Sequence, residues 1–174
     1  MVRGQLDGPI HAPRPHPGGT RERGRLRGTP CGWSGNDMAD RLQVGMTFEK
    51  TRTVTEPLTA AQLHRRGIYV MSTPELVRLV EHCALEGVQP FLQPNQNSVG
   101  TRVDLRHLGG TPLGMRVTAR TTLVEIDRRR LVFQAEVHDE LEKVGEGTHE
   151  RFIVDAEKHL QRIQEKHARW KSAG

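Results

Sequence analysis

Four residues that are suited to chemistry occur in order along the chain: Thr73, Glu81, Gly100 and His107. The carboxylate is the most unusual of them. On a helical projection at about 100° per residue, Glu81 falls between Val77 and Leu85, inside the apolar arc of a helix expected over residues 73–85. Because burying an ionised carboxylate is costly, it should be paired, protonated or catalytic. The alternative is a boundary glutamate that reaches solvent or bonds a nearby backbone group.

His107 ends the strand that is expected after this helix. Strict alternation along the strand places its imidazole on the inward, apolar face, together with Val99, Val103 and Leu105. An inward histidine is either a hydrogen-bonded core residue or an acid-base group. Both roles stay open from the strand pattern alone.

Thr73 lies at the start of the helix. The run Ser72-Thr73-Pro74-Glu75 offers a hydroxyl for the N-cap, a proline for the first helical position and an acid in the first turn. A helix start also presents free N–H groups and a partial positive charge, which suit a developing oxyanion. Capping and catalysis are therefore compatible at Thr73. Gly100 interrupts a β-rich run, which marks a bulge or a place where a ligand approaches the backbone closely.

The elements that must position these residues follow an α+β order. A β-branched segment at 48–55 predicts a first strand, and the helix is expected to end near Leu85 because Gly87 and Pro90 follow. Four more strands and a charged C-terminal helix are expected at 98–108, 115–126, 130–139, 144–154 and from about 155 to 170. The wide apolar surface of the single long helix predicts an antiparallel sheet wrapped around it.

Over residues 38–166 the chain resembles the fluoroacetyl-CoA thioesterase family, a branch of the hot-dog superfamily. The matching runs are Val80-Glu81-His82-Cys83, Ser98-Val99-Gly100-Thr101, Thr111-Pro112-Leu113-Gly114 and Gly147-Thr148-His149-Glu150-Arg151. That family places a glutamate eight residues after a threonine and a histidine 26 residues after the glutamate. Thr73, Glu81 and His107 have the same spacings here. The resemblance implies a hot-dog fold, acyl-CoA thioesterase activity and catalytic roles for these three residues.

The resemblance also implies two residues on the substrate side of the site. Gly100 would lie beside the acyl group, and Arg151 would be a substrate-binding arginine, although an arginine on an outward strand face is ordinarily a solvated charge. The family places phenylalanines over the site in the connection before the helix. The corresponding stretch, residues 64–69, contains none. We therefore expect a short acyl or aryl acyl thioester as substrate rather than fluoroacetyl specificity.

The implied reaction is hydrolysis of the thioester to the free acid and coenzyme A. Glu81 either attacks the carbonyl to give a mixed anhydride or activates water as a general base. His107 would handle the protons of the incoming water, and Thr73 would hold the geometry. The coenzyme A thioester is the substrate, and no metal or other cofactor is expected.

Hot-dog domains resemble one another in pairing across a sheet edge, so we expect a homodimer or a dimer of dimers. The phosphates of coenzyme A would meet surface arginines, with these as candidates: Arg102, Arg106 and Arg116.

Composition bounds these expectations. The 174 residues carry a net charge of +5 and are 34% hydrophobic, which fits one domain, placed at 41–174. Residues 1–40, rich in Arg, Gly and Pro, are expected to be disordered. The sequence contains no apolar run of about 18 residues, so no membrane span is expected. The basic N-terminus lacks the apolar segment of a secretory signal. Two distant cysteines indicate neither a zinc site nor a disulfide framework, so the expected compartment is the cytoplasm.

Two other functions compete with hydrolysis. A non-catalytic hot-dog domain would bind acyl-CoA or another ligand saturably without cleaving it. A basic N-terminal tail could bind nucleic acid, which the positive charge suits. The chain lacks a helix-turn-helix, zinc or aromatic RNA-binding signature, so a nucleic-acid partner is not expected.

Overall fold

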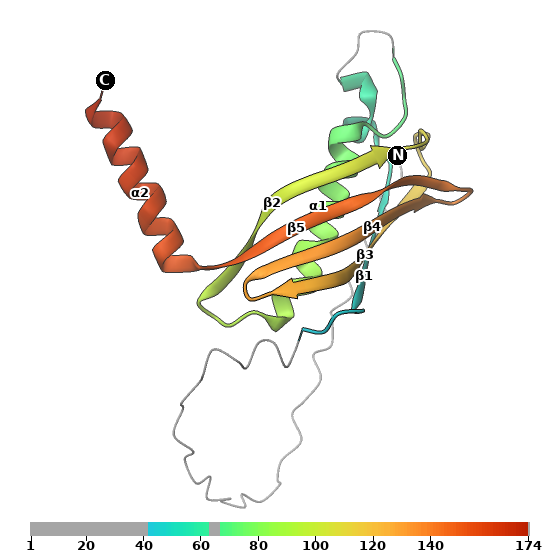
Figure 1. Ribbon diagram of the computed structural model, residues 1–174. Coiled ribbons are helices and arrows are strands. Elements are labelled where there is room, and N and C mark those ends of the chain that lie inside the picture. Colours follow the sequence, from blue (N-terminus) through green and yellow to red (C-terminus); the bar gives the residue numbers. More distant parts are fainter. Residues whose placement is uncertain (1–41, 63–66, 174) are drawn as a thin grey trace, which may run out of the picture. The chain divides into compact units, whose positions relative to one another are not determined.

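The computed structural model describes residues 42–62 and 67–173 of the chain (Figure 1). Five antiparallel strands form one sheet in the order β1-β3-β4-β5-β2. The strands are β1 (Thr47–Thr53), β2 (Gln96–His107), β3 (Arg116–Asp127), β4 (Arg130–Asp139) and β5 (Lys143–Asp155). The helices are α1 (Thr73–Val88) and α2 (Ala156–Ser172), with short 3-10 turns at Glu56–Leu58, Ala60–Gln62 and Gln89–Phe91. The α+β order predicted from the sequence is confirmed, whereas the extension predicted for residues 1–40 lies outside the described residues.

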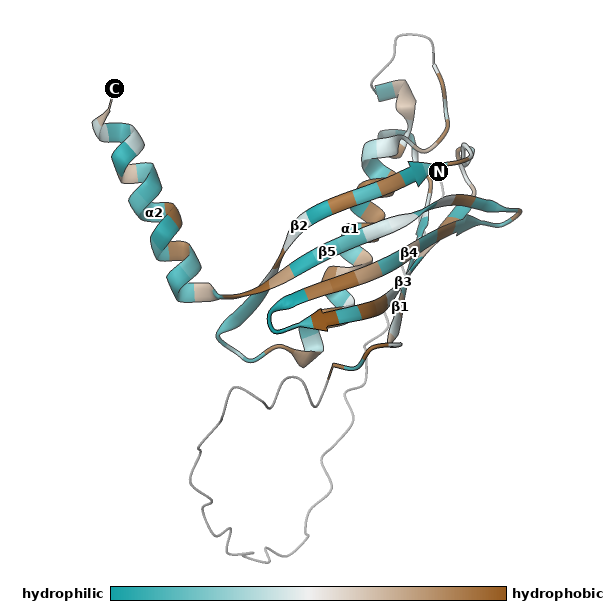
Figure 2. Ribbon diagram, in the orientation of Figure 1, coloured by the Kyte–Doolittle hydropathy of each residue, from teal (hydrophilic) through white to brown (hydrophobic). Residues whose placement is uncertain are grey.

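Helix α1 packs against one face of the sheet. Its buried side chains form most of one side of the core: Leu76, Leu79, Val80, Cys83, Ala84 and Val88. The sheet contributes the other side of the core with alternating inward residues such as Val117, Ala119, Phe133 and Ala135. Figure 2 shows the resulting alternation of apolar and polar residues along the strands. Each large aliphatic side chain buried in this way contributes about 1.5–3 kcal/mol to folding, so the two faces hold the helix in place.

The helix continues beyond Leu85, near which the sequence pattern predicted its end, and passes through Gly87. A β-carbon at this position would lie 2.2 Å from Cγ of Phe48 on β1. The absence of a side chain therefore lets helix and strand approach closely. This packing offsets the low helix propensity of glycine. Helix α1 ends at Val88, and Pro90 belongs to the following 3-10 turn.

Strand β2 carries the bulge that Gly100 indicated. The register with β5 shifts between Gly100 and Arg102, so Thr101 is the extra residue. A bulge reverses the alternation of faces on either side of it. Val99 consequently faces outward, opposite the exposed Phe152, and the prediction that it shares the inward face of His107 is wrong.

Two elements keep an uncovered surface within the described residues, namely the edge strand β2 and helix α2. Strand β2 is an edge strand, with β5 on one side only. Helix α2 follows β5 and buries none of its residues, and its three large apolar side chains are exposed: Leu160, Ile163 and Trp170. Among the described helices, none is both long and apolar enough to cross a membrane.

Candidate active site

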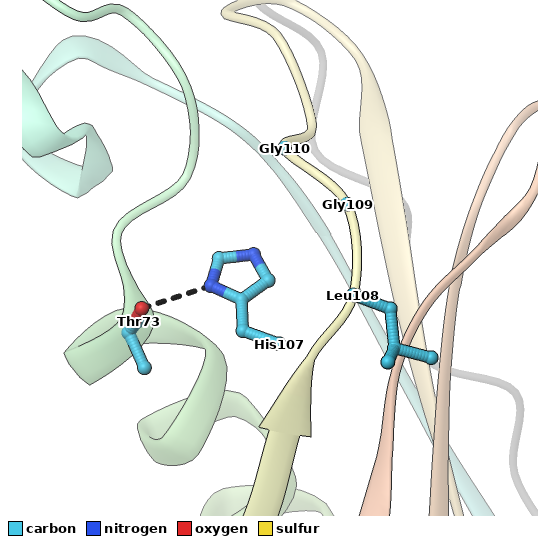
Figure 3. A pocket seen from close by; sticks show the side chains of 5 residues that line it. All are labelled: Thr73, His107, Leu108, Gly109 and Gly110. Atoms are coloured by element: carbon cyan, nitrogen blue, oxygen red, sulfur yellow. Dashed lines mark hydrogen bonds between the residues drawn. The ribbon is translucent and has the colours of Figure 1, made fainter.

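The start of α1 meets the end of β2 through a hydrogen bond between Thr73 and His107 (Figure 3). The N-cap of α1 is Ser72, which makes no side-chain capping bond, and Thr73 is the first helical residue. The predicted capping role of Thr73 is therefore wrong. Its Oγ1 instead lies 2.9 Å from Nδ1 of His107. Two of the predicted site residues, a hydroxyl and an imidazole, thus come together at the positive end of the helix dipole through a hydrogen bond that the sequence did not predict.

An open pocket of about 270 Å³ adjoins this pair. Its lining consists of Thr73, His107, Leu108, Gly109 and Gly110. Figure 3 shows the imidazole between the helix start and the glycine backbone, with the Leu108 side chain directed away from it. A ligand in this pocket would lie against the imidazole and the backbone of both glycines.

Glu81 lies farther along α1, against the bulged part of β2. A β-carbon on Gly100 would come within 2.6 Å of Oε1 of Glu81, so the carboxylate occupies the space that a side chain would need. The Glu81 side chain is 42% exposed. The expectation that it is sequestered from water is thus not met within one chain. Val77 and Leu85, one turn before and after it, are also only partly buried.

Arg151 lies behind this carboxylate. Its residue exposure is only 2%, so the interpretation of an outward, solvated arginine is wrong. The register of β5 on β2 places Arg151 opposite Gly100, on the inward face. Nε donates to Oγ of Ser98 (3.0 Å) and Nη2 to the Ser98 carbonyl (2.7 Å), while Nη1 lies 3.8 Å from Oε1 of Glu81. Burial lowers the pKa of the guanidinium, and the Glu81 carboxylate opposes that shift.

His149 completes this group, and the sequence reasoning assigned it no role. It is fully buried, with Nε2 3.2 Å from Nη1 of Arg151 and Nδ1 2.9 Å from the Arg102 carbonyl. Burial lowers its pKa from the ordinary value, the Arg102 carbonyl opposes that effect, and the charge of Arg151 lowers it further. A signal was present, because His149 and Arg151 stand two apart in a strand and must share a face.

The candidate residues therefore form two groups within one chain. Thr73 and His107 make the first; Glu81, Gly100 and Arg151, with Ser98 and His149 behind them, make the second. The offset of eight residues from Thr73 to Glu81 along the helix corresponds to about 12 Å of rise. A ligand atom in contact with the Glu81 carboxylate is consequently beyond hydrogen-bonding reach of Thr73 in the same chain.

Other candidates from the sequence have different surroundings. The three arginines suggested for phosphate binding are all in ion pairs: Arg102 with Asp104 and Glu150, Arg106 with Glu146, and Arg116 with Glu140. Cys83 is a free thiol in the core whose Sγ lies 3.3 Å from the Phe48 carbonyl. Burial raises the pKa of this thiol, which does not suit a nucleophile.

The chain matches known proteins in both sequence and fold. A family model described as fluoroacetyl-CoA-specific thioesterase matches residues 54–157. A fluoroacetyl-CoA thioesterase of Streptantibioticus cattleyicolor is 30% identical over 135 residues, which cover 74% of this chain and 97% of the relative. A variant of the fluoroacetyl-CoA thioesterase, solved in complex with acetyl-CoA, is 28% identical with a TM-score of 0.67, covering 72% of this chain and 98% of that one.

The fold has a second, more distant match. A hot-dog-like protein from Thermanaerovibrio acidaminovorans reaches a TM-score of 0.69 at 23% identity, covering 77% of this chain and 97% of its own. The predicted hot-dog fold is confirmed.

Proposed function

Because this chain belongs to the fluoroacetyl-CoA-specific thioesterase family, we propose that it hydrolyses a short or aryl acyl-CoA thioester to the free acid and coenzyme A. The observation that carries the proposal is the placement of Glu81. Its carboxylate rests on the bare backbone of Gly100, open to a ligand on one side, with the buried Arg151 on the other. This arrangement offers an oxygen nucleophile or base at a surface that a flat thioester can approach.

The proposed reaction divides the work between the two groups. Glu81 attacks the thioester carbonyl, giving a mixed anhydride and the coenzyme A thiolate, or it removes a proton from the water that attacks. His107 moves the proton of the incoming water, and the Thr73 hydroxyl fixes the orientation of its ring. The free N–H groups at the start of α1 are suited to the negative charge that develops on the carbonyl oxygen. The coenzyme A thioester is the substrate, and the proposed reaction calls for no further cofactor.

We propose that the two groups meet across a homodimer. Pairing of β2 with its counterpart in a second copy, antiparallel and with the twofold axis near Val103, would bring the Thr73–His107 pair of one chain toward Glu81 of the other. Three observations support this pairing. Strand β2 is an edge strand of the described sheet, Val103 is 40% exposed on the inward face, and Glu81 is half exposed in a row with Val77 and Leu85. A partner covering this edge would also exclude water from the Glu81 carboxylate. A dimer of dimers is the larger assembly we propose to test for.

The substrate class and compartment are part of the same proposal. The relative solved with acetyl-CoA supports a short acyl group. Ile68 and Tyr69, about half exposed just before α1, are suited to cover an acyl chain or ring where the family's phenylalanines would stand. We also propose a cytoplasmic location, because a free thiol such as Cys83 is maintained in reducing compartments.

A thiol-release assay with purified protein tests the function. We expect turnover of at least one member of a panel of short, branched and aromatic acyl-CoAs, and slower turnover of long-chain ones. Saturable binding of every acyl-CoA without thiol release would favour a non-catalytic binding domain and contradict the proposal.

A further inference from the structure

The buried ring of His149 has a protonation state that its two partners determine. A guanidinium can only donate hydrogen bonds, so at 3.2 Å from Nη1 of Arg151 the Nε2 atom must accept. A carbonyl oxygen can only accept, so at 2.9 Å from the Arg102 carbonyl the Nδ1 atom must donate. The ring is therefore neutral, with its single proton on Nδ1.

The same ring restricts where Arg151 can lie. It stacks on Phe133 of β4, with 6.4 Å between the ring centres and 28° between the planes, and its Cε1 would be 3.3 Å from a β-carbon on Gly100. Ser98 holds the Nε and Nη2 side of the guanidinium. His149 holds the Nη1 side, which is the side that faces Glu81. Arg151 is thus fixed from both directions by Ser98 and His149, which are themselves buried.

We propose that His149 is a positioning residue for catalysis. It acts through Arg151, whose fixed guanidinium holds the Glu81 carboxylate on the Gly100 backbone in the orientation that attack requires. This inference rests on the proposed function and names the buried residues that control its nucleophile or base. A carboxylate misplaced by about 1 Å loses on the order of 100-fold in rate. Such precision explains why three polar groups are kept inside the core at this point.

The proposal requires the ring to stay neutral. The charged groups around it are Arg151 on β5, Glu81 on α1 and Glu150 next to it in the chain; the backbone of Arg102 faces it from β2 and the Phe133 ring from β4. A proton on Nε2 would remove the acceptor for Arg151 and place two positive charges side by side. The guanidinium would then be displaced, together with the carboxylate it holds.

Two substitutions test the role. His149→Phe keeps the ring that stacks on Phe133 but removes the acceptor, and we expect kcat to fall about 10–100-fold while KM changes less than about twofold. His149→Gln restores an acceptor oxygen near the Nε2 position and should recover kcat to within about threefold of the wild type. His138→Gln, on the exposed face of β4, is the matched control and should leave kcat unchanged. Circular dichroism and thermal melting are recorded for each variant.

The outcomes separate this proposal from the proposed function. If folded His149→Phe retains the wild-type kcat, or if His149→Gln is as slow as His149→Phe, positioning by His149 is wrong while hydrolysis itself stands. If the wild type hydrolyses no acyl-CoA, the proposed function fails. The ring can still be tested in that case by two-bond ¹H–¹⁵N correlation spectra of the wild-type protein, where a proton on Nε2 would contradict the geometry.

Discussion

The guanidinium of Arg151 and the carboxylate of Glu81 face each other with very different access to solvent. Nη1 and Oε1 are 3.8 Å apart, yet the Arg151 side chain is 3% exposed and the Glu81 side chain 42%. Arg151 keeps its position through hydrogen bonds to Ser98 and His149, so the cation is fixed and the carboxylate is attracted to it. A ligand can therefore reach Glu81 without displacing the charge that orients it.

The first prediction concerns this carboxylate. Glu81→Gln keeps the shape of the side chain but removes the nucleophile or base, so we expect kcat to fall by about 10²–10⁴ in the thiol-release assay. Glu86→Gln, on the same helix and paired with Lys50 at the surface, is the matched control and should retain wild-type kcat. Wild-type turnover by a folded Glu81→Gln protein would show that this residue is not catalytic.

The second prediction concerns the proposed assembly. Mixtures of Glu81→Gln and His107→Ala chains, each inactive alone, should regain activity if a site takes Glu81 from one chain and His107 from its partner. Random exchange makes about half of the dimers mixed, and each mixed dimer has one intact site, so about a quarter of wild-type activity should return. The mixture is unfolded and refolded together, and its mass is measured by light scattering.

The control for this experiment is a mixture of wild-type and doubly substituted chains. If Glu81 and His107 of the same chain share a site, this control keeps about half of the wild-type activity and the first mixture stays inactive, whereas a site shared between chains leaves the control with about a quarter. That result, or a monomeric mass for the active enzyme, would contradict the shared site.

The contrast between Thr73 and Arg151 shows what the sequence could predict. The order of elements and the bulge at Gly100 follow from local signals, namely periodicity and a glycine in a strand. Thr73 and His107 were identified as site residues through the family resemblance, and the hydrogen bond between them was not predicted. The orientation of Arg151 could not be predicted from such signals, because a charged residue in a strand is ordinarily solvated. Its burial depends on the register of β5 against β2, which places it opposite a glycine. Register across strands is a property of the assembled sheet.

The end of α1 differs from its prediction for a similar reason. Glycine is a poor helix former, and Pro90 follows three residues after Gly87, so local propensity favours an end near Leu85. The close contact with Phe48 lies 39 residues away in the chain and overrides that preference. The role of His149 was not predicted for a similar reason, since two of its contacts come from the neighbouring strands β2 and β4.

A third prediction follows from the space over Gly100. In Gly100→Ala the new β-carbon would lie 2.6 Å from Oε1 of Glu81, the movable end of a flexible side chain. The carboxylate should swing away, so we expect kcat/KM to fall about 100-fold while the melting temperature changes by less than about 2 °C. Asn97→Ala, exposed on the same strand, is the control. Unchanged kcat/KM for Gly100→Ala would show that the carboxylate need not rest on this backbone.

The other close glycine should show the opposite balance. In Gly87→Ala the β-carbon would meet the rigid Phe48 ring at 2.2 Å, so helix and strand must separate. Although alanine favours the helix, we expect the free energy of unfolding to fall by about 1–3 kcal/mol in urea denaturation, as for other overpacked sites. Repeating the substitution in a Phe48→Ala background should remove most of this loss. Equal losses in both backgrounds would contradict steric pressure from Phe48.

The last prediction links the buried His149 to pH. Burial holds the native pKa of its imidazole below the ordinary 6.5, and Arg151 lowers it further, whereas the Arg102 carbonyl, Glu81 and Glu150 act against the shift. On acidification, His149 therefore binds its proton near pH 6.5 in the unfolded chain but only at lower pH in the native chain. Stability from the neutral ring is complete above pH 6.5 and is lost as the pH falls toward the native pKa, at up to about 1.4 kcal/mol per pH unit.

Urea denaturation of the wild type and His149→Gln at pH 7.5 and pH 5.0 measures this contribution. Histidines and carboxylates elsewhere are the same in both proteins, so the difference between their pH responses belongs to residue 149. We expect the wild type to lose more free energy of unfolding on acidification than His149→Gln does. Equal losses would mean that His149 takes up its proton in the native state without penalty, which a ring held between the Arg151 guanidinium and the Arg102 carbonyl cannot do.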